Sequence, residues 1–176
     1  MPNPAVRAVI ATFGGVNVDV PGFCQRLPRP GETVPGRCHT IALGGKVANQ
    51  VAAVARLGGQ SLTIGRAGNA TFGARARDRL DALGVGREHP IFADNVSTGV
   101  ALISVDARGE NCIVVIGGAN MTVDQALVDH SAEAPRLAPV LLLQLEVPLA
   151  PVLAAAALTR AGGGRVILDP APAPSA

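Results

Sequence analysis

Aromatic residues are almost absent from this sequence, which contains four Phe and no Trp or Tyr among its 176 residues. A chain with so few aromatic side chains offers few platforms on which nucleic-acid bases could stack. Charge is also sparse, since 16% of the residues are charged and the net charge of +2 arises from scattered arginines. These two shortages argue against nucleic acid as a main partner.

Cysteine is scarce as well. Cys24, Cys38 and Cys112 are odd in number and widely spaced, which fits neither a disulfide framework nor a CxxC metal site. The pattern predicts buried, reduced thiols in a cytoplasmic protein and no metal site.

No segment predicts a membrane span or a signal peptide. Polar residues and prolines interrupt the apolar segment 140–158 at Gln144, Glu146, Pro148 and Pro151. Such interruptions argue against a membrane partner. The apolar residues 8–13 run directly into a Gly-rich stretch without a convincing cleavage site, so they are interpreted as part of a first strand.

The apolar content is high, with a hydrophobic fraction of 48%. This excludes a disordered chain, and the length suffices for one domain with a sizeable core or for part of a larger one. Strands and helices are predicted to alternate, which indicates an α/β fold with a parallel sheet. The predicted strands are 6–13, 37–43, 61–66, 98–105, 111–116, 140–145 and 165–168, and the predicted helices are 47–57, a helix from the turn 68–73 to about 83, 122–130 capped by Thr122, and 149–160.

One pair of strands interrupts this alternation. The runs 98–105 and 111–116 are separated by a five-residue turn that contains Gly109, which is typical of a β-hairpin. Together with the strand 37–43, the hairpin predicts a small second sheet that stands apart from the main one, as a lid would.

The segment 44–59, GGKVANQVAAVARLGG, is the strongest candidate for a ligand site. A Gly pair precedes an apolar helix, so N–H groups at the helix start, with Lys46 and Asn49 as side-chain donors, could hold a hydroxylated or anionic small molecule. Lys46 is the single lysine among 15 basic residues. An ordinary loop and helix cap is an equally good interpretation of this segment alone.

Polar residues also follow two of the predicted buried strands. Asn17 and Asp19 come after the first strand, and Glu146 follows the strand 140–145. Because the carboxyl ends of parallel strands share one edge of the sheet, these groups are expected to lie together. The alternatives are that Asn17 and Asp19 only shape a turn and that Glu146 pairs with an arginine.

These residues resemble the ribokinase-like (PfkB) carbohydrate kinases, and within that family the bacterial ribokinases most closely. The matching motifs are NVD at 17–19, LPRPGET at 27–33, GGKVANQ at 44–50, STGVALISVDARGEN at 97–111, GGAN at 117–120, QLEVP at 144–148 and DPAPA at 169–173. They occur in order and cover almost the whole chain.

The resemblance implies a three-layer α/β/α sandwich with a small β-sheet lid. Residues 1–176 would be the N-terminal, sugar-binding part of a kinase domain that transfers a phosphate from ATP, with Mg²⁺ and K⁺, to a sugar such as D-ribose. Lid segments would lie at about 18–43 and 97–117, and the family implies homodimers formed through the lid. The implied sugar-binding residues are Asn17, Asp19, Gly45, Lys46, Val47, Ala48, Asn49 and Glu146.

Two departures from the family pattern concern specificity. Val47 stands where ribokinases usually have Gly, which weakens the choice of ribose more than the choice of family. The turn 68–73, GNATFG, replaces a usually acidic turn. A fructokinase or a nucleoside kinase of the same family therefore remains an alternative.

A third departure is an absence. The DTxGAGD-like signature, which supplies the family's anion hole and catalytic base, does not occur in this sequence. We therefore expect a form of the fold that is truncated before its ATP-binding C-terminal half and contains no catalytic residue. Such a chain is expected to be inactive alone and to be able to associate with the missing half. A non-catalytic remnant that binds sugar or dimerises is the alternative. A nicotinamide-binding domain is disfavoured because no GxGxxG joins the first strand to a helix.

Overall fold

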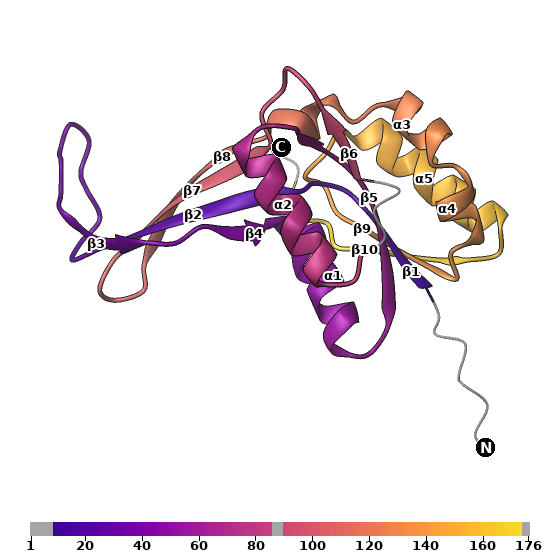
Figure 1. Cartoon of the computed structure of the whole chain (residues 1–176), viewed down its shortest axis with the longest axis horizontal. Coiled ribbons are helices and arrows are strands. Elements are labelled where there is room, and N and C mark those ends of the chain that lie inside the picture. The colour runs from indigo at the N-terminus through magenta and orange to yellow at the C-terminus, as the bar shows by residue number, and fades with distance from the viewer. Residues whose placement is uncertain (1–8, 86–89, 174–176) are drawn as a thin grey trace.

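A five-stranded parallel sheet forms the centre of the computed structural model, which describes residues 9–85 and 90–173. Residues 6–8 of the first predicted strand lie outside the described residues. The strand order is β10-β9-β1-β5-β6 (Figure 1). The strands are β1 (Val9–Phe13), β5 (Gln60–Gly68), β6 (Pro90–Ala93), β9 (Val140–Leu143) and β10 (Arg165–Leu168).

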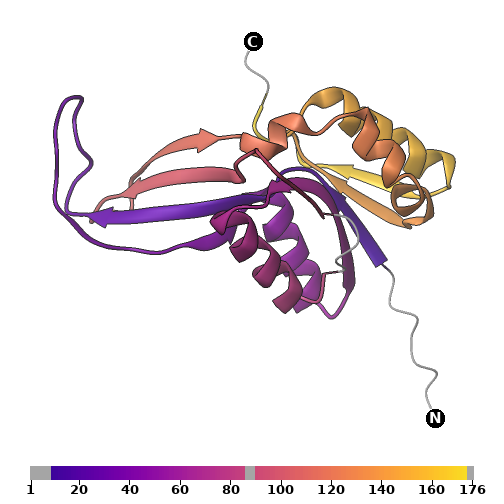
Figure 2. The same ribbon diagram turned by 45° about the horizontal axis from the view of Figure 1, so that its top comes forward.

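Helices cover both faces of this sheet, as Figure 2 shows. One face carries α1 (Gly45–Arg56) and α2 (Thr71–Ala82), and the other carries α3 (Gln125–His130), α4 (Glu133–Leu137) and α5 (Leu149–Ala161). The predicted three-layer α/β/α sandwich is therefore confirmed.

The burial of β1 explains why this strand consists mainly of apolar residues. Ala11 and Phe13 pack into the core on the α3–α5 face. Thr12 is fully buried and its Oγ1 lies 3.2 Å from Oγ1 of Thr63 on β5. Val9 at the start of the strand is exposed, but residues 11–13 have no solvent-facing position to alternate with, because helices cover both faces of the sheet there.

A second sheet extends away from the sandwich (Figure 1). It has the order β3-β2-β7-β8, and β4 also pairs with β2. Its strands are β2 (Asn17–Cys24), β3 (Gly36–His39), β4 (Ala42–Gly44), β7 (Gly99–Val105) and β8 (Asn111–Ile116). β7 and β8 form the predicted antiparallel hairpin. The small sheet apart from the main one is thus confirmed, and we call it the lid sheet.

The prediction missed the central strand of the lid sheet. Residues 17–19 were expected only to follow the first strand as polar site residues, with a turn as the alternative, but they begin the eight-residue strand β2. Pro21 and Gly22 within β2 hid the strand pattern, since both residues are unfavourable in strand interiors. The strand forms because β7 pairs with it from Asn17 to Phe23.

Other boundaries also differ from the predictions. Thr122 does not cap the next helix: it ends the 3₁₀ helix η1 (Gly118–Thr122), while Asp124 caps α3 by accepting a hydrogen bond from the Leu127 N–H over 3.1 Å. The short elements β6 and α4 were not predicted. The strand 165–168 was predicted with its observed bounds.

The cysteines are all free thiols, but only one is buried. Cys24 is buried as expected, whereas Cys38 on β3 and Cys112 on β8 are exposed. The prediction of three buried thiols was wrong because both exposed residues lie on outer strands of the lid sheet. Among the described residues, no helix is long and apolar enough to span a membrane.

Candidate functional site

The residues singled out from the sequence converge where β1 ends and β2 begins. A Cβ atom on Gly45, at the start of α1, would lie 3.1 Å from both the backbone nitrogen of Asn17 and the backbone carbonyl oxygen of Gly15. A Cβ on Gly15 would lie 3.1 Å from Cβ of Glu146, which follows β9. The start of β2, the start of α1 and the loop after β9 therefore meet at the carboxyl edge of the sheet, as predicted.

Asn17 is almost completely buried, with 4% of its surface exposed. Its Oδ1 accepts a hydrogen bond of 2.7 Å from Nδ2 of Asn120, a residue of η1. Its Nδ2 makes no hydrogen bond within the part of the chain that the structure describes. Asn17 can therefore donate to a ligand.

Asp19 lies two residues further along β2, on the same face as Asn17. A Cβ on Gly44 would overlap the Asp19 carboxylate, so this position needs glycine. Burial raises the pKa of the Asp19 carboxyl above its ordinary value of 3.8. The carboxylate forms no hydrogen bond with the described residues and is available to accept ligand hydroxyl groups.

The start of α1 is held by a distant side chain. Gly44, the residue that precedes the helix, provides no side-chain cap. Instead, Oε2 of Glu146 accepts a hydrogen bond of 3.0 Å from the backbone N–H of Lys46. A carboxylate at this position satisfies one free N–H and interacts favourably with the helix dipole.

The remaining predicted residues lie along the first turns of α1. The Lys46 side chain is half-buried and forms no ion pair within the described residues, so its ammonium group is available to a ligand. Asn49 is exposed, and Ala48 is buried. Val47 packs with Val51 and other core residues between α1 and α2, so its side chain belongs to the core and does not join the polar groups.

Two side chains at this site were not recognised from the sequence, although both lie in motifs that were noted. Asn120 belongs to GGAN, and Gln144 belongs to QLEVP. Gln144 is fully buried at the end of β9, and its Nε2 donates to Oε1 of Gln50 on α1. Both side chains contact segments about 100 residues away, a relationship that one sequence does not reveal.

The lid sheet adds an apolar surface next to Asp19. Asp19 pairs with Ala101 on β7, and Ala101 pairs with Val115 on β8. Paired residues share one face of a sheet, so these side chains lie on the same side of the lid sheet as the Asp19 carboxylate. The site thus combines carboxylate, amide and ammonium groups with an apolar wall.

No group of three or more His, Cys, Asp or Glu side chains lies together in residues 9–85 and 90–173.

The unusual turn 68–73 is tied into the sandwich. The Asn69 side chain donates to Asp94 over 3.0 Å and accepts from Arg77 over 3.0 Å. The Arg77 guanidinium also lies 4.1 Å above the Phe92 ring. These contacts give the turn a structural role that does not require acidic residues.

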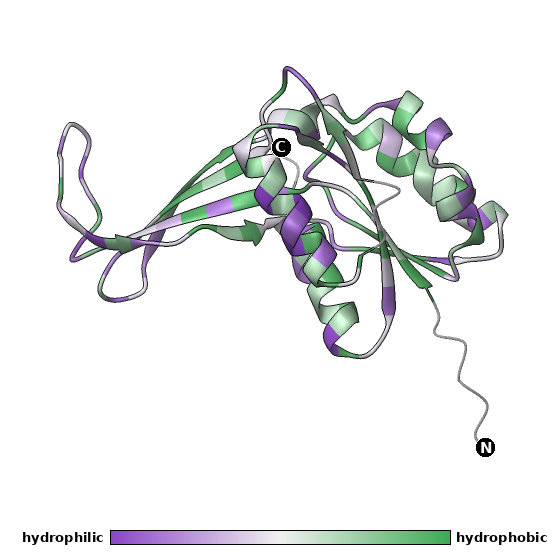
Figure 3. Ribbon diagram, viewed as in Figure 1, coloured by the Kyte–Doolittle hydropathy of each residue, from purple (hydrophilic) through white to green (hydrophobic). Residues whose placement is uncertain are grey.

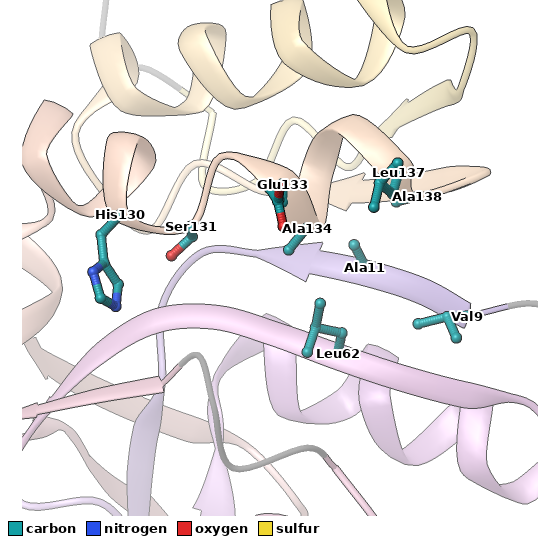
Figure 4. A pocket seen from close by; sticks show the side chains of 9 residues that line it. All are labelled: Val9, Ala11, Leu62, His130, Ser131, Glu133, Ala134, Leu137 and Ala138. Carbon is teal, nitrogen blue, oxygen red and sulfur yellow. The ribbon is translucent and has the colours of Figure 1, made fainter.

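A separate pocket lies away from the polar cluster (Figure 4). It opens between β1, β5 and the segment that carries α3 and α4. Val9, Ala11 and Leu62 line one side, and His130, Ser131 and Glu133 approach from the other. Val9 begins β1, whereas Asn17 follows its end, so this pocket and the polar cluster are different sites.

The sequence of this chain is similar to those of known carbohydrate kinases. Residues 7–176 match the model of the pfkB family of carbohydrate kinases. The chain is 34% identical over 168 residues to a ribokinase of Haemophilus influenzae, covering 96% of this chain and 55% of that protein. It is also 34% identical over 164 residues to a deoxyribokinase of Salmonella typhi, covering 93% of this chain and 54% of that protein.

A solved structure shows the same fold. Arabidopsis thaliana ribokinase, complexed with ribose and ATP, superimposes with a TM-score of 0.84 at 32% identity, covering 94% of this chain and 54% of that one. The chain spans about half the length of the curated relatives it matches.

Proposed function

The chain belongs to the pfkB family of carbohydrate kinases, and on this basis we propose that it forms the sugar-binding part of an ATP-dependent kinase for D-ribose, which yields ribose 5-phosphate. In this proposal the sugar lies between the edge of the central sheet and the lid sheet. Residues 1–176 would form the N-terminal part of one kinase domain, with lid segments at about 18–43 and 97–117.

One observation carries this proposal: groups that can bind hydroxyls gather where the sheet meets the lid. Asp19 accepts, Asn17 donates through its free Nδ2, and Lys46, whose backbone N–H is bound by Glu146, adds a positively charged side chain at the start of α1. A sugar presents several hydroxyls, each of which donates and accepts, so a mixed set of groups is what it requires. Gly45 and Asn49 would complete the pocket, with Val47 and Ala48 contributing their backbone.

We propose that the residues that carry out phosphoryl transfer are not among these 176 residues. Phosphoryl transfer needs positioned phosphates, a metal ion and a base for the attacking hydroxyl. The A. thaliana relative was solved with ribose and ATP, and this chain covers 54% of it. We therefore expect ATP, Mg²⁺ and K⁺ to be held mainly by the other half, and the 176-residue chain alone to bind sugar without turnover.

Ribose is the proposed substrate because ribokinases recur among the relatives. The deoxyribokinase relative makes 2-deoxyribose the nearest competitor. We propose a cytoplasmic protein that pairs with a second copy through the lid sheet or with a separate C-terminal half.

The test is calorimetric titration of the purified chain with ribose, 2-deoxyribose, fructose and adenosine. ADP release with ATP, Mg²⁺ and K⁺ is measured in parallel. We expect ribose to bind most tightly, binding to be lost in Asp19→Ala, and no sugar-dependent ADP release. Turnover that Asp19→Ala abolishes would show that the chain is catalytically complete. Absence of binding to all four ligands would contradict a sugar site in this chain.

A further inference from the structure

Asn120 makes three hydrogen bonds at the junction of β1 and β2. Its Oδ1 accepts from the Val16 N–H over 2.9 Å, and its Nδ2 donates to the Val16 carbonyl over 3.3 Å. The same Nδ2 donates to Oδ1 of Asn17 over 2.7 Å. Asn120 is 1% exposed, so water does not compete for these bonds.

The two hydrogen bonds to Val16 determine the positions of Oδ1 and Nδ2 in the Asn120 amide. A backbone N–H can only donate, so it must meet the amide oxygen, and the amide NH₂ must lie on the carbonyl side. The oxygen and nitrogen of an Asn side chain are similar in shape, and hydrogen-bond partners are what distinguish them. Here the backbone supplies that distinction.

The orientation of Asn120 then determines the orientation of Asn17. The Asn120 NH₂ needs an acceptor, and Oδ1 of Asn17 is the side-chain atom that it meets. The reverse orientation of Asn17 would bring two NH₂ groups together and leave a buried carbonyl oxygen unpaired, which is unfavourable. Nδ2 of Asn17 must therefore point away from Asn120.

Two glycines leave room for this pair of amides. A Cβ on Gly99, which pairs with Asn17 across the lid sheet, would overlap Oδ1 of Asn17 and Nδ2 of Asn120. A Cβ on Gly15 would lie 3.3 Å from Cγ of Asn120. Larger residues at either position would displace the amides from each other.

We propose that Asn120 is a positioning residue that sets the Asn17 amide so that its NH₂ group, and not its oxygen, faces the bound sugar. Asn17 then donates to a sugar oxygen, while Asp19 on the same face of β2 accepts from a sugar hydroxyl. With Asn17 as a donor and Asp19 as an acceptor two residues apart, the site can bind a pair of sugar hydroxyls. It disfavours a ligand with two anionic oxygens, because the Asp19 carboxylate repels them. This inference rests on the proposed sugar-binding function.

The test uses the ¹⁵N-labelled chain, in which side-chain NH₂ signals are observed directly. Asn17→Asp identifies the Asn17 signal by its loss. In wild type, the Asn17 NH₂ protons, which have no hydrogen-bond partner among the described residues, should exchange with water faster than those of Asn120 and shift on addition of ribose. Those of Asn120 should exchange slowly.

Asn120→Asp is the decisive variant, because it replaces the NH₂ group by an acceptor. The Asn17 amide should turn its NH₂ toward the new carboxylate, so its protons become protected from exchange without any sugar present. The dissociation constant for ribose should rise at least tenfold, as the site then offers two acceptors and no amide donor. Leu127→Ala, a core change on α3, should lower stability while changing ribose affinity less than twofold.

A second variant guards against misfolding of Asn120→Asp. Asn17→Asp keeps an acceptor for Asn120 but removes the donor to the sugar, so ribose affinity should again fall at least tenfold. Wild-type affinity in either variant would overturn the positioning role. If the wild-type chain does not bind ribose, the proposed function of the isolated chain fails. The exchange measurement still tests the orientation of the Asn17 amide, because unchanged exchange of its NH₂ protons in Asn120→Asp would overturn the proposed orientation.

Discussion

Glu146 accepts a hydrogen bond from the backbone N–H of Lys46 over 3.0 Å, although the two residues are 100 positions apart. The bond joins the first turn of α1 to the loop after β9. It uses one carboxylate oxygen, Oε2, and leaves Oε1 without a partner among the described residues. Glu146 can therefore hold the helix start and contact a ligand at the same time.

Removal of this carboxylate should lower both stability and sugar affinity. Because a hydrogen bond to a charged group is lost, Glu146→Ala is expected to reduce the free energy of unfolding by about 1 to 2 kcal/mol. Glu146→Gln keeps a neutral acceptor and should lose about half as much. Urea unfolding measures both variants. Asp129→Ala, which removes an exposed carboxylate on α3, should cost only about 0.3 kcal/mol, and an equal loss there would contradict a special role for Glu146.

Gly45 should tolerate a side chain less well than a glycine of similar conformation elsewhere. Gly45 has φ +82°, and Gly58 at the other end of α1 has φ +78°. Alanine in this region of φ costs roughly 1 to 2 kcal/mol at either site. At Gly45 the added Cβ also meets two backbone atoms at 3.1 Å, whereas nothing lies within 4 Å at Gly58.

Gly45→Ala should therefore destabilise the protein by about 1 to 3 kcal/mol more than Gly58→Ala. It should also abolish ribose binding, because the crowded atoms belong to Asn17 and Gly15 at the site. Thermal unfolding and calorimetric titration measure the two effects. Equal destabilisation by both substitutions would show that the close contacts at Gly45 are relieved at no cost.

The raised pKa of Asp19 predicts that its contribution to the free energy of unfolding decreases as the pH rises. Burial disfavours the ionised carboxylate, so the folded state binds this proton more tightly than the unfolded state does. The Asp19 contribution is therefore most favourable below pH 3.8 and is lost as the pH rises from 3.8 through the raised pKa, above which it levels off.

Asp19→Asn should remove this pH dependence, so the variant should gain stability relative to wild type as the pH rises from 4 to 7. The same change should abolish ribose binding, because the amide replaces the carboxylate acceptor. Urea unfolding across this pH range provides the measurement, with Asp129→Asn as the control for an exposed carboxyl. A constant difference in stability between Asp19→Asn and wild type at every pH would contradict the assignment.

The elements that the sequence predicted well are those whose own residues determine them. The strand 165–168 is a short β-branched run between a Gly-rich turn and a proline-rich segment, and its bounds were correct. β2 was missed because its stability comes from pairing with β7, about 80 residues later in the chain, and not from its own sequence with Pro21 and Gly22. Pairing partners of this kind override local strand preference.

The same distinction applies to the site. Asn17, Asp19 and Glu146 were predicted to lie together because they follow apolar runs, and parallel strands bring such positions to one edge. Asn120 was not singled out because the observation that points to it is a set of three hydrogen bonds with Val16 and Asn17 across more than 100 residues. Val47 was included by its place in a motif, whereas its side chain packs in the core.

The hairpin β7–β8 of the lid sheet is largely apolar (Figure 3), and we expect its face opposite Asp19 to bind a second copy of the chain. In the register of β7 and β8, Leu102 pairs with Val114, while Ala101 pairs with Val115 on the Asp19 side. Leu102 is 45% exposed and Val114 is 57% exposed. An exposed apolar strand at a sheet edge is costly unless it is covered.

Val114→Asp should therefore convert a dimer into a monomer, since pairing would bury the new carboxylate without a partner. Sedimentation equilibrium should give twice the 17.8 kDa chain mass for wild type and 17.8 kDa for the variant. Leu137→Asp is the matched control, because Leu137 on α4 is 77% exposed and lies on the sandwich. A monomeric wild type, or a dimer that survives Val114→Asp, would show that this face of the lid is not the interface. Ribose affinity should be retained in Val114→Asp, since the substituted side chain lies on the face opposite Asp19.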